Sequence, residues 1–227
     1  MIPSAPHQTT KVFLVRHGQS VANAGGIPPD HITNPLTDLG HAQAKAFAEA
    51  FDCSPTLFVV SPFLRARQTA EPTLQRFPGV PVEEWPIHEF TYLEPERHNG
   101  TNEEQQMPHI LEYWERDDPN YIDGPGAESF TQFFDRAREA TRRLIQRNPG
   151  GCIVVFTHGL LMQAFRLLAL FPNATDAELM SNFRRFHFDN FIKNTEVAEF
   201  EVADNKLRLV GQPQLAAFTL QKEARPA

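Results

Sequence analysis

Cysteine and basic residues are scarce in this 227-residue sequence, and long hydrophobic runs are missing. The two cysteines, Cys53 and Cys152, lie far apart in the sequence and form no C-x-x-C pair, which predicts reduced thiols rather than a disulfide framework. Lys and Arg number 21 against 28 Asp and Glu, and the net charge of -7 disfavours binding to nucleic acid or to an anionic membrane. The longest apolar stretch, Leu160 to Phe171, is too short to span a membrane and contains Gln163 and Arg166.

The first ten residues, Met1 to Thr10, lack the apolar segment of a signal peptide. Together with the reduced cysteines, this predicts a cytoplasmic protein. Because the negative net charge repels anions, an anionic substrate would have to be held by a local cluster of Arg and His.

Short apolar segments alternate with longer amphipathic ones, as in α/β proteins. Three near-continuous apolar segments predict strands that are buried on both faces of a largely parallel sheet: Lys11–Val15, Thr56–Val60 and Cys152–Phe156. Two later segments, 196–202 and 206–210, predict a hairpin around Asp204 and Asn205 at one edge of the sheet.

Helix starts are marked by capping residues ahead of segments with helical periodicity. The Pro62 to Phe77 segment also predicts a helix, with a break or kink near Pro72. The capping residues are Thr37, Ser129 with Gln132, and Thr175 with Glu178.

Between about Phe90 and Ala127 no regular pattern holds, although Met107–Trp114 could form a short helix. A long insertion of this kind in a compact domain is often a lid or a binding loop. We therefore expect one α/β domain over residues 1–227, with an insertion at about 90–127.

Three predicted strands place His and Arg residues at the end of the sheet where the strands' carboxyl ends lie. The first ends in Arg16-His17-Gly18, the third ends in Thr157-His158-Gly159, and Arg65 follows the second in the first turn of a helix. Ligands bind beyond the carboxyl ends of strands in open α/β sheets, and Gly18 would let the backbone approach a ligand closely. The planar guanidinium of arginine can bind two phosphate oxygens, and histidine can act as a nucleophile. This end of the sheet is therefore a candidate phosphate site.

The chain from Lys11 to Leu161 resembles the histidine phosphatase superfamily, also called phosphoglycerate mutase-like. The resemblance implies a three-layer α/β/α sandwich with a mostly parallel sheet. The matching segments follow the family's order: Arg16–Asn23 (R-H-G-x-S/T-x-x-N), Pro35–Ala44 (L-T-x-x-G-x-x-Q-A), Ser61–Ala70 (S-x-L-x-R-A-x-Q-T-A), Gly126–Ser129 (G-x-E-S) and Thr157–Gly159 (the second-histidine motif).

The resemblance also implies roles for individual residues. His17 would attack phosphorus and become phosphohistidine, while Arg16, Arg65 and His158 would hold the phosphoryl oxygens, with Asn23 nearby. Fixed cationic donors suit this reaction because its transition state carries charge on the equatorial oxygens. The implied reaction uses a small phosphorylated substrate and needs no metal or other cofactor.

Two carboxylates compete for the role of general acid. In the family this residue follows the Arg65 helix, often as L-x-E at a strand end, and Ile87-His88-Glu89 fits that pattern. Glu96 competes because Glu96 to Gly100 is similar to a stretch of phosphoglycerate mutases in which that Glu is the acid. We favour Glu89, since it lies at an apparent strand end and Glu96 lies in a Pro-rich loop.

The predicted activity is phosphomonoester hydrolysis through phosphohistidine. A cofactor-dependent phosphoglycerate mutase is the alternative, although the insertion holds only Arg97 and Arg116 as fixed cations against nine acidic residues. A non-catalytic interaction protein of the same fold is a third possibility, but such proteins usually lose a site His or Arg. No metal-ligand spacing recurs among the insertion-side histidines His88, His98 and His109, and the sequence leaves the physiological substrate and the oligomeric state open.

Overall fold

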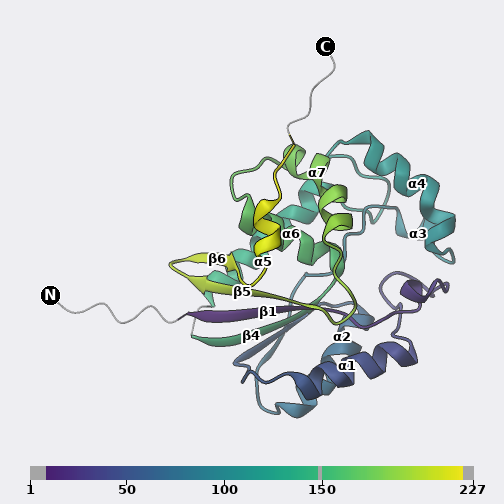
Figure 1. Cartoon of the computed structure of the whole chain (residues 1–227). Helices are drawn as coiled ribbons and strands as arrows, with labels where there is room; N and C mark the ends of the chain where they lie inside the picture. The colour runs from purple at the N-terminus through teal and green to yellow at the C-terminus, as the bar shows by residue number, and fades with distance from the viewer. Residues whose placement is uncertain (1–8, 148–149, 222–227) are drawn as a thin grey trace.

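The computed structural model describes residues 9–147 and 150–221, so residues 1–8, on which the signal-peptide prediction depends, lie outside it. The described residues form a six-stranded sheet in the order β3-β2-β4-β1-β5-β6 (Figure 1). In that order the strands are β3 (Val82–Glu84), β2 (Leu57–Val60), β4 (Gly151–Thr157), β1 (Thr10–Arg16), β5 (Val197–Ala203) and β6 (Lys206–Leu209).

The sheet is parallel over its first four strands and antiparallel over the last two. β1 pairs with β4, β4 with β2, and β2 with β3 in parallel, whereas β5 runs antiparallel to both β1 and β6. The turn between β5 and β6 contains Asp204 and Asn205, both with positive φ, as a tight hairpin turn requires. The predicted mostly parallel sheet and its edge hairpin are therefore confirmed.

Helices cover both faces of the sheet, which gives the predicted three layers (Figure 1). Residues alternate along β1: Val12 and Leu14 pack with the core under α5, α6 and α7, whereas Val15 packs with Phe51 and Ala70 on the α1 and α2 side. The helices concerned are α1 (Asp38–Ala50), α2 (Leu64–Arg76), α5 (Phe130–Gln146), α6 (Gly159–Leu170) and α7 (Asp176–Asp189).

The predicted helix starts are confirmed, but the predicted break in α2 is not present. The Thr37 side chain accepts a hydrogen bond from the backbone N–H of Gly40, and full capping boxes begin α5 and α7 at Ser129 and Thr175. α2 runs without interruption through Pro72, whose ring removes one backbone donor from the helix.

The insertion is more regular than its sequence suggested. It forms α3 (Pro95–His98) and α4 (Glu103–Arg116), and α4 begins well before the expected short helix and continues through Pro108. Trp114 of α4 stacks on Phe183 of α7, with ring centroids 5.7 Å apart, so the insertion is anchored to the helical layer. Two short 3₁₀ helices complete the fold: η1 (Ala22–Ala24) and η2 (Pro213–Ala217). Within the described ranges, no helix combines the length and the apolar character needed to cross a membrane.

Candidate active site

The two predicted histidines lie side by side at one end of the sheet. His17 follows β1 and His158 follows β4, and these neighbouring strands are parallel. Their ring centroids are 5.2 Å apart, and the two residues are only 3% and 0% exposed. The backbone N–H of His17 donates to the carbonyl of Thr157 at 3.0 Å and so extends the strand pairing to the site.

Hydrogen bonds fix both nitrogens of the His17 ring. Nδ1 lies 2.7 Å from the carbonyl oxygen of Gly18, and Nε2 accepts from Nε of Arg65 at 3.1 Å. Nδ1 therefore carries the proton, and Nε2 keeps its lone pair. Burial lowers the pKa of His17 well below its usual value, and the charges of Arg65 and Arg16 lower it further. The ring is neutral at physiological pH, as a nucleophile requires.

His158 is oriented by a residue that the sequence analysis did not single out. Nε2 of His158 lies 2.7 Å from the hydroxyl oxygen of Ser61, which follows β2. Nδ1 is buried and has no hydrogen-bond partner among the described residues. Burial, followed by the charge of Arg65, lowers the pKa of His158 well below its usual value. His158 is therefore a fixed neutral ring with one nitrogen left for a ligand.

Two arginines stand beside the histidines. Arg65 lies in the first turn of α2, is 7% exposed, and donates through Nη1 to the carbonyl of His31 at 2.7 Å. Burial lowers the pKa of Arg65 to about 10, so the side chain still carries its charge at neutral pH. Arg16 donates through Nη1 to the carbonyl of Ile192, and its guanidinium lies 5.2 Å from the ring centre of Phe191. Burial lowers the pKa of Arg16 as well, and Glu89 opposes that effect.

Glu89 lies at the same site, although the reason given for it from the sequence is wrong. β3 ends at Glu84, so Glu89 belongs to the loop that follows and does not mark a strand end. Its carboxylate accepts a hydrogen bond from the backbone N–H of Leu160 in the first turn of α6, at 3.2 Å. Its charge raises the pKa of both Arg16 and Arg65. The loop brings the carboxylate to the arginines after the strand has ended.

The competing carboxylate, Glu96, lies elsewhere. It is an exposed residue of α3 and is not among the described residues that line the cavity next to Arg65. Only one of the two candidate acids is therefore brought to the paired histidines and arginines.

The segment from Asn190 to Glu196, between α7 and β5, holds several site residues in place. Ile192 accepts from Arg16, and the Asn194 side-chain amide donates both to the carbonyl of His17 at 3.0 Å and to Oδ1 of Asn23 at 3.1 Å. The 190–196 segment is held in turn by the buried Arg166, which donates to the carbonyl of Asn190. Asn194 was missed from the sequence because nothing local links it to Arg16 or His17.

Gly18 serves the close packing of the backbone. A Cβ atom on Gly18 would lie 2.6 Å from the carbonyl oxygen of Gly40, and a Cβ on Gly40 would lie 2.1 Å from that of Gln19. The Gly18 N–H donates to the hydroxyl of Thr69 at 2.9 Å. The two glycines therefore allow α1 to pack closely against the loop that carries His17.

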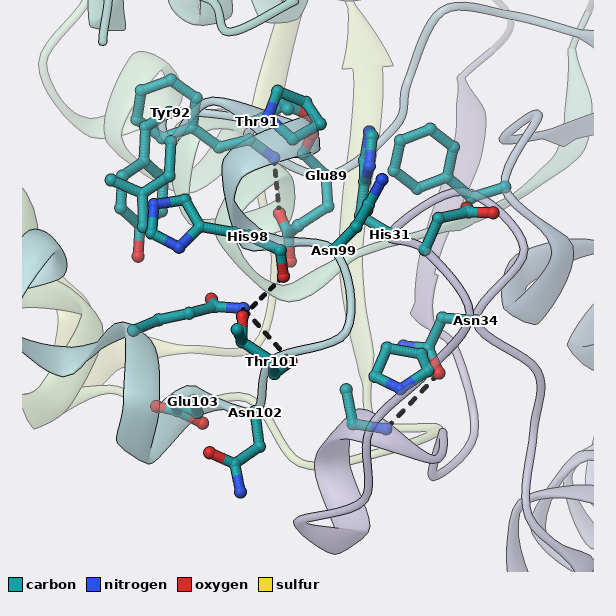
Figure 2. Close-up of a pocket in the computed structure, with 18 of the residues that line it drawn as sticks. His31, Asn34, Glu89, Thr91, Tyr92, His98, Asn99, Thr101, Asn102 and Glu103 are labelled. Carbon is teal, nitrogen blue, oxygen red and sulfur yellow. Dashed lines mark hydrogen bonds between the residues drawn. The ribbon is translucent and has the colours of Figure 1, made fainter. Parts of the chain in front are cut away.

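A cavity of about 310 Å³ opens beside Arg65, and Figure 2 shows most of the residues that line it. Its lining includes Asn23, Arg65 and Glu89 from the site. The rest of the lining comes largely from the insertion, with Tyr92, Leu93, His98, Asn99, Thr101 and Glu103 among its residues.

The histidines considered above as metal ligands have other contacts. His88 stacks on Phe63 with ring centroids 5.2 Å apart, and His98 contacts His109 at 4.9 Å. Over residues 9–147 and 150–221, no group of three His, Cys, Asp or Glu side chains is arranged to hold a metal ion.

Comparison with known proteins identifies the family. The chain is 28% identical over 170 residues to a metal-independent phosphoserine phosphatase of Arabidopsis thaliana, covering 70% of this chain and 68% of the relative. It is 25% identical to a probable phosphoglycerate mutase, GpmB, of Serratia proteamaculans, covering 67% and 71%. A mycobacterial glucosyl-3-phosphoglycerate phosphatase has the same fold, with a TM-score of 0.68, 23% identity and coverage of 88% and 97%. The family model of the histidine phosphatase superfamily (branch 1) matches residues 12–212, and the chain belongs to that superfamily.

Proposed function

We propose that this protein hydrolyses phosphomonoesters and that His17 carries the phosphoryl group between the two half-reactions. The observation that carries the proposal is the state of His17: a buried neutral ring whose Nδ1 is held by Gly18 and whose Nε2 lies beside Arg65. In the first step, Nε2 forms a bond to phosphorus as the bond from phosphorus to the alcohol oxygen breaks. In the second step, water takes the phosphoryl group from Nε2 and releases inorganic phosphate.

The positive groups around His17 would bind the phosphoryl oxygens. Arg16 and Arg65 supply fixed charge in a buried setting, where it stabilises a developing anion more strongly than in water. The unpartnered Nδ1 of His158 would donate a further hydrogen bond, because Ser61 occupies the other nitrogen of that ring. Asn23, held by Asn194, would complete the set.

Glu89 would act as acid and then as base. In the first step, its protonated carboxyl gives a proton to the leaving alcohol oxygen. In the second step, the resulting carboxylate takes a proton from the attacking water, which restores the starting state. Its place beside both arginines and on the cavity wall supports this assignment over Glu96.

The names of the relatives support a hydrolase that acts on a small phosphorylated metabolite, since phosphatases are prominent among them. We propose as well that the chain works as a single domain in the cytoplasm. A reducing compartment would keep Cys53 and Cys152 as thiols, and both are free in the described part of the chain.

The direct test is to trap the phosphoenzyme. After rapid quench from a labelled phosphomonoester, the wild-type protein should carry an acid-labile, base-stable phosphoryl group, and His17→Ala should carry none and show no turnover. EDTA should leave turnover unchanged, and vanadate should inhibit it. A label that persists in His17→Ala would disprove the role of His17, and activity that requires added Mg²⁺ or Zn²⁺ would disprove the metal-independent mechanism.

The mutase alternative differs in the fate of the phosphoenzyme. A mutase must return the phosphoryl group to a carboxylate-bearing acceptor, yet neither Arg97 nor Arg116 is among the described residues that line the cavity. We therefore expect inorganic phosphate as the main product. Interconversion of 3- and 2-phosphoglycerate with catalytic 2,3-bisphosphoglycerate should be slow in comparison. Mutase turnover exceeding phosphate release tenfold would reverse the conclusion.

A further inference from the structure

The cavity beside Arg65 has more room than a phosphoryl group needs. It extends from Asn23, Arg65 and Glu89 to the insertion, and Figure 2 shows Tyr92, His98 and Glu103 among the residues that line it. If the proposed function holds, the phosphoryl group binds beside Arg65. The alcohol part of the substrate then occupies the rest of the cavity, so the charges that line it select among substrates.

Away from Arg65, the fixed charges among the described residues that line the cavity are negative. Among the described residues that line the cavity, Arg65 is the one Lys or Arg, and it is already committed to the phosphoryl end. Apart from Glu89, the carboxylates among these residues are Asp30 and Glu103. Hydrogen bonds from Thr33 and Ile32 lower the pKa of Asp30, which keeps that carboxylate charged.

The cations of the insertion are engaged elsewhere. Arg97 pairs with Asp123, and Arg116 pairs with Glu112 at 3.3 Å while lying over the ring of Tyr121 at 3.9 Å. Neither arginine is free to hold a carboxylate in the cavity without giving up these contacts.

The histidines of the cavity add no positive charge. Burial lowers the pKa of His31, and the nearby Arg65 lowers it further. Burial also lowers the pKa of His98, with a further contribution from Arg97. Both rings are neutral above about pH 6.5, so they can donate or accept hydrogen bonds but cannot neutralise an anion.

The start of α4 faces the cavity and is capped by its own side chains. Asn102 accepts from the backbone N–H of Gln105 at 3.0 Å, and the Gln105 side chain accepts from the backbone N–H of Asn102 at 3.0 Å. Glu103 and Glu104 then place two negative charges in the first helical turn. The positive end of the helix is thus compensated by its own side chains.

We infer that the cavity selects phosphomonoesters whose alcohol part carries no anionic group, such as an uncharged polyol or an alcohol bearing an ammonium group, and that Glu103 enforces this choice. The inference rests on the proposed function and narrows its substrate class. Glu103 repels a second anion on the substrate and attracts a cation, while neutral polar residues such as Asn99, Thr101 and Gln106 offer hydrogen bonds to hydroxyl groups.

Two pairs of substrates test the choice, because each pair differs by one carboxylate. Phosphoethanolamine is compared with phosphoserine, and glycerol 3-phosphate with 3-phosphoglycerate. We expect kcat/KM to be roughly tenfold higher for the member without the carboxylate, mainly through a lower KM, which is the size of a screened repulsion across several ångströms.

Variants at two neighbouring positions assign the effect to Glu103. Glu103→Gln should reduce the preference within each pair severalfold, and Glu103→Lys should abolish or reverse it. Glu104→Gln is the matched control, since Glu104 lies in the same helical turn but is not among the described cavity residues. This control should retain the wild-type preference.

The outcomes separate this inference from the proposed function. Nitrophenyl phosphate serves as a reference substrate, because it carries neither a carboxylate nor an ammonium group. If the protein hydrolyses nitrophenyl phosphate but uses phosphoserine and 3-phosphoglycerate as well as or better than their partners without a carboxylate, the charge selection is wrong. The proposal that the protein is a phosphatase would still stand. Equal responses of Glu103→Gln and Glu104→Gln would show that Glu103 does not enforce the choice. If no phosphomonoester is hydrolysed, both proposals fail.

Discussion

Glu89 lines the same cavity as Arg65, and its proposed role as general acid gives a prediction at the scale of one residue. An alkoxide needs a proton as it leaves, whereas nitrophenolate leaves well without one. Glu89→Gln should therefore lower kcat for an alkyl phosphate by about 100-fold or more and for nitrophenyl phosphate by less than about tenfold. Steady-state kinetics on the two substrates measure the difference.

Glu96→Gln is the matched control for that experiment. Because Glu96 is exposed on α3, its substitution should affect both substrates little. If Glu96→Gln shows the dependence on leaving group and Glu89→Gln does not, the acid has been assigned to the wrong carboxylate, and the mutase alternative gains support.

At the scale of elements, the 190–196 segment joins the loop before β5 to Arg16, His17 and Asn23. Asn194→Ala removes the hydrogen bonds to His17 and Asn23 and should lower kcat/KM by about 10- to 100-fold, since small displacements of reacting groups are costly. Its cost in stability should be only about 1 kcal/mol. Vanadate affinity and chemical denaturation measure the two effects separately.

Lys193→Ala provides the comparison, because Lys193 is an exposed neighbour in the same segment. It should leave vanadate affinity and kcat/KM near the wild-type values. Equal losses in both variants, or a loss in Asn194→Ala fully explained by unfolding, would contradict a positioning role for Asn194.

The elements that sequence analysis predicted well are those specified by local patterns. Apolar runs mark β1, β2 and β4, and side-chain caps mark α1, α5 and α7. The 14-residue α4 was underestimated because Pro108 interrupts its pattern, although a helix can pass through a proline at the loss of one hydrogen bond.

The site was predictable to the extent that motifs follow strands. His17, His158 and Arg65 stand at or just after strand ends, and parallel pairing brings such ends together. Glu89 was chosen partly because a strand was expected to end there, but β3 ends at Glu84. The choice of Glu89 therefore rested on the family resemblance and not on the local pattern. Asn194 depends on the pairing of β1 with β5, which no local pattern encodes.

For the whole molecule, the buried histidines link stability to pH. His17 and His158 are neutral when folded, because their pKa values are lowered well below 6.5, but in the unfolded chain they protonate near pH 6.5. The unfolded state therefore binds more protons below that pH, and stability is lost as the pH falls. Between pH 7 and 5.5 these two groups should cost about 2 to 3 kcal/mol.

Urea denaturation at a series of pH values measures this dependence. His158→Gln should reduce the loss between pH 7 and 5.5 by about 1 kcal/mol, whereas His41→Gln, at an exposed position of α1, should leave it unchanged. An unchanged slope in His158→Gln would mean that other groups govern the acid sensitivity.

The position of β1 between β4 and β5 has a consequence for synthesis on the ribosome. β1 is made first, yet its neighbours are residues 151–157 and 197–203, so both edges of an apolar strand stay unpaired while most of the chain is translated. At about 5 to 20 residues per second, this interval lasts roughly 10 to 40 s. We expect the nascent chain to be inactive and dependent on chaperones throughout that time, and to gain activity only when β5 has emerged.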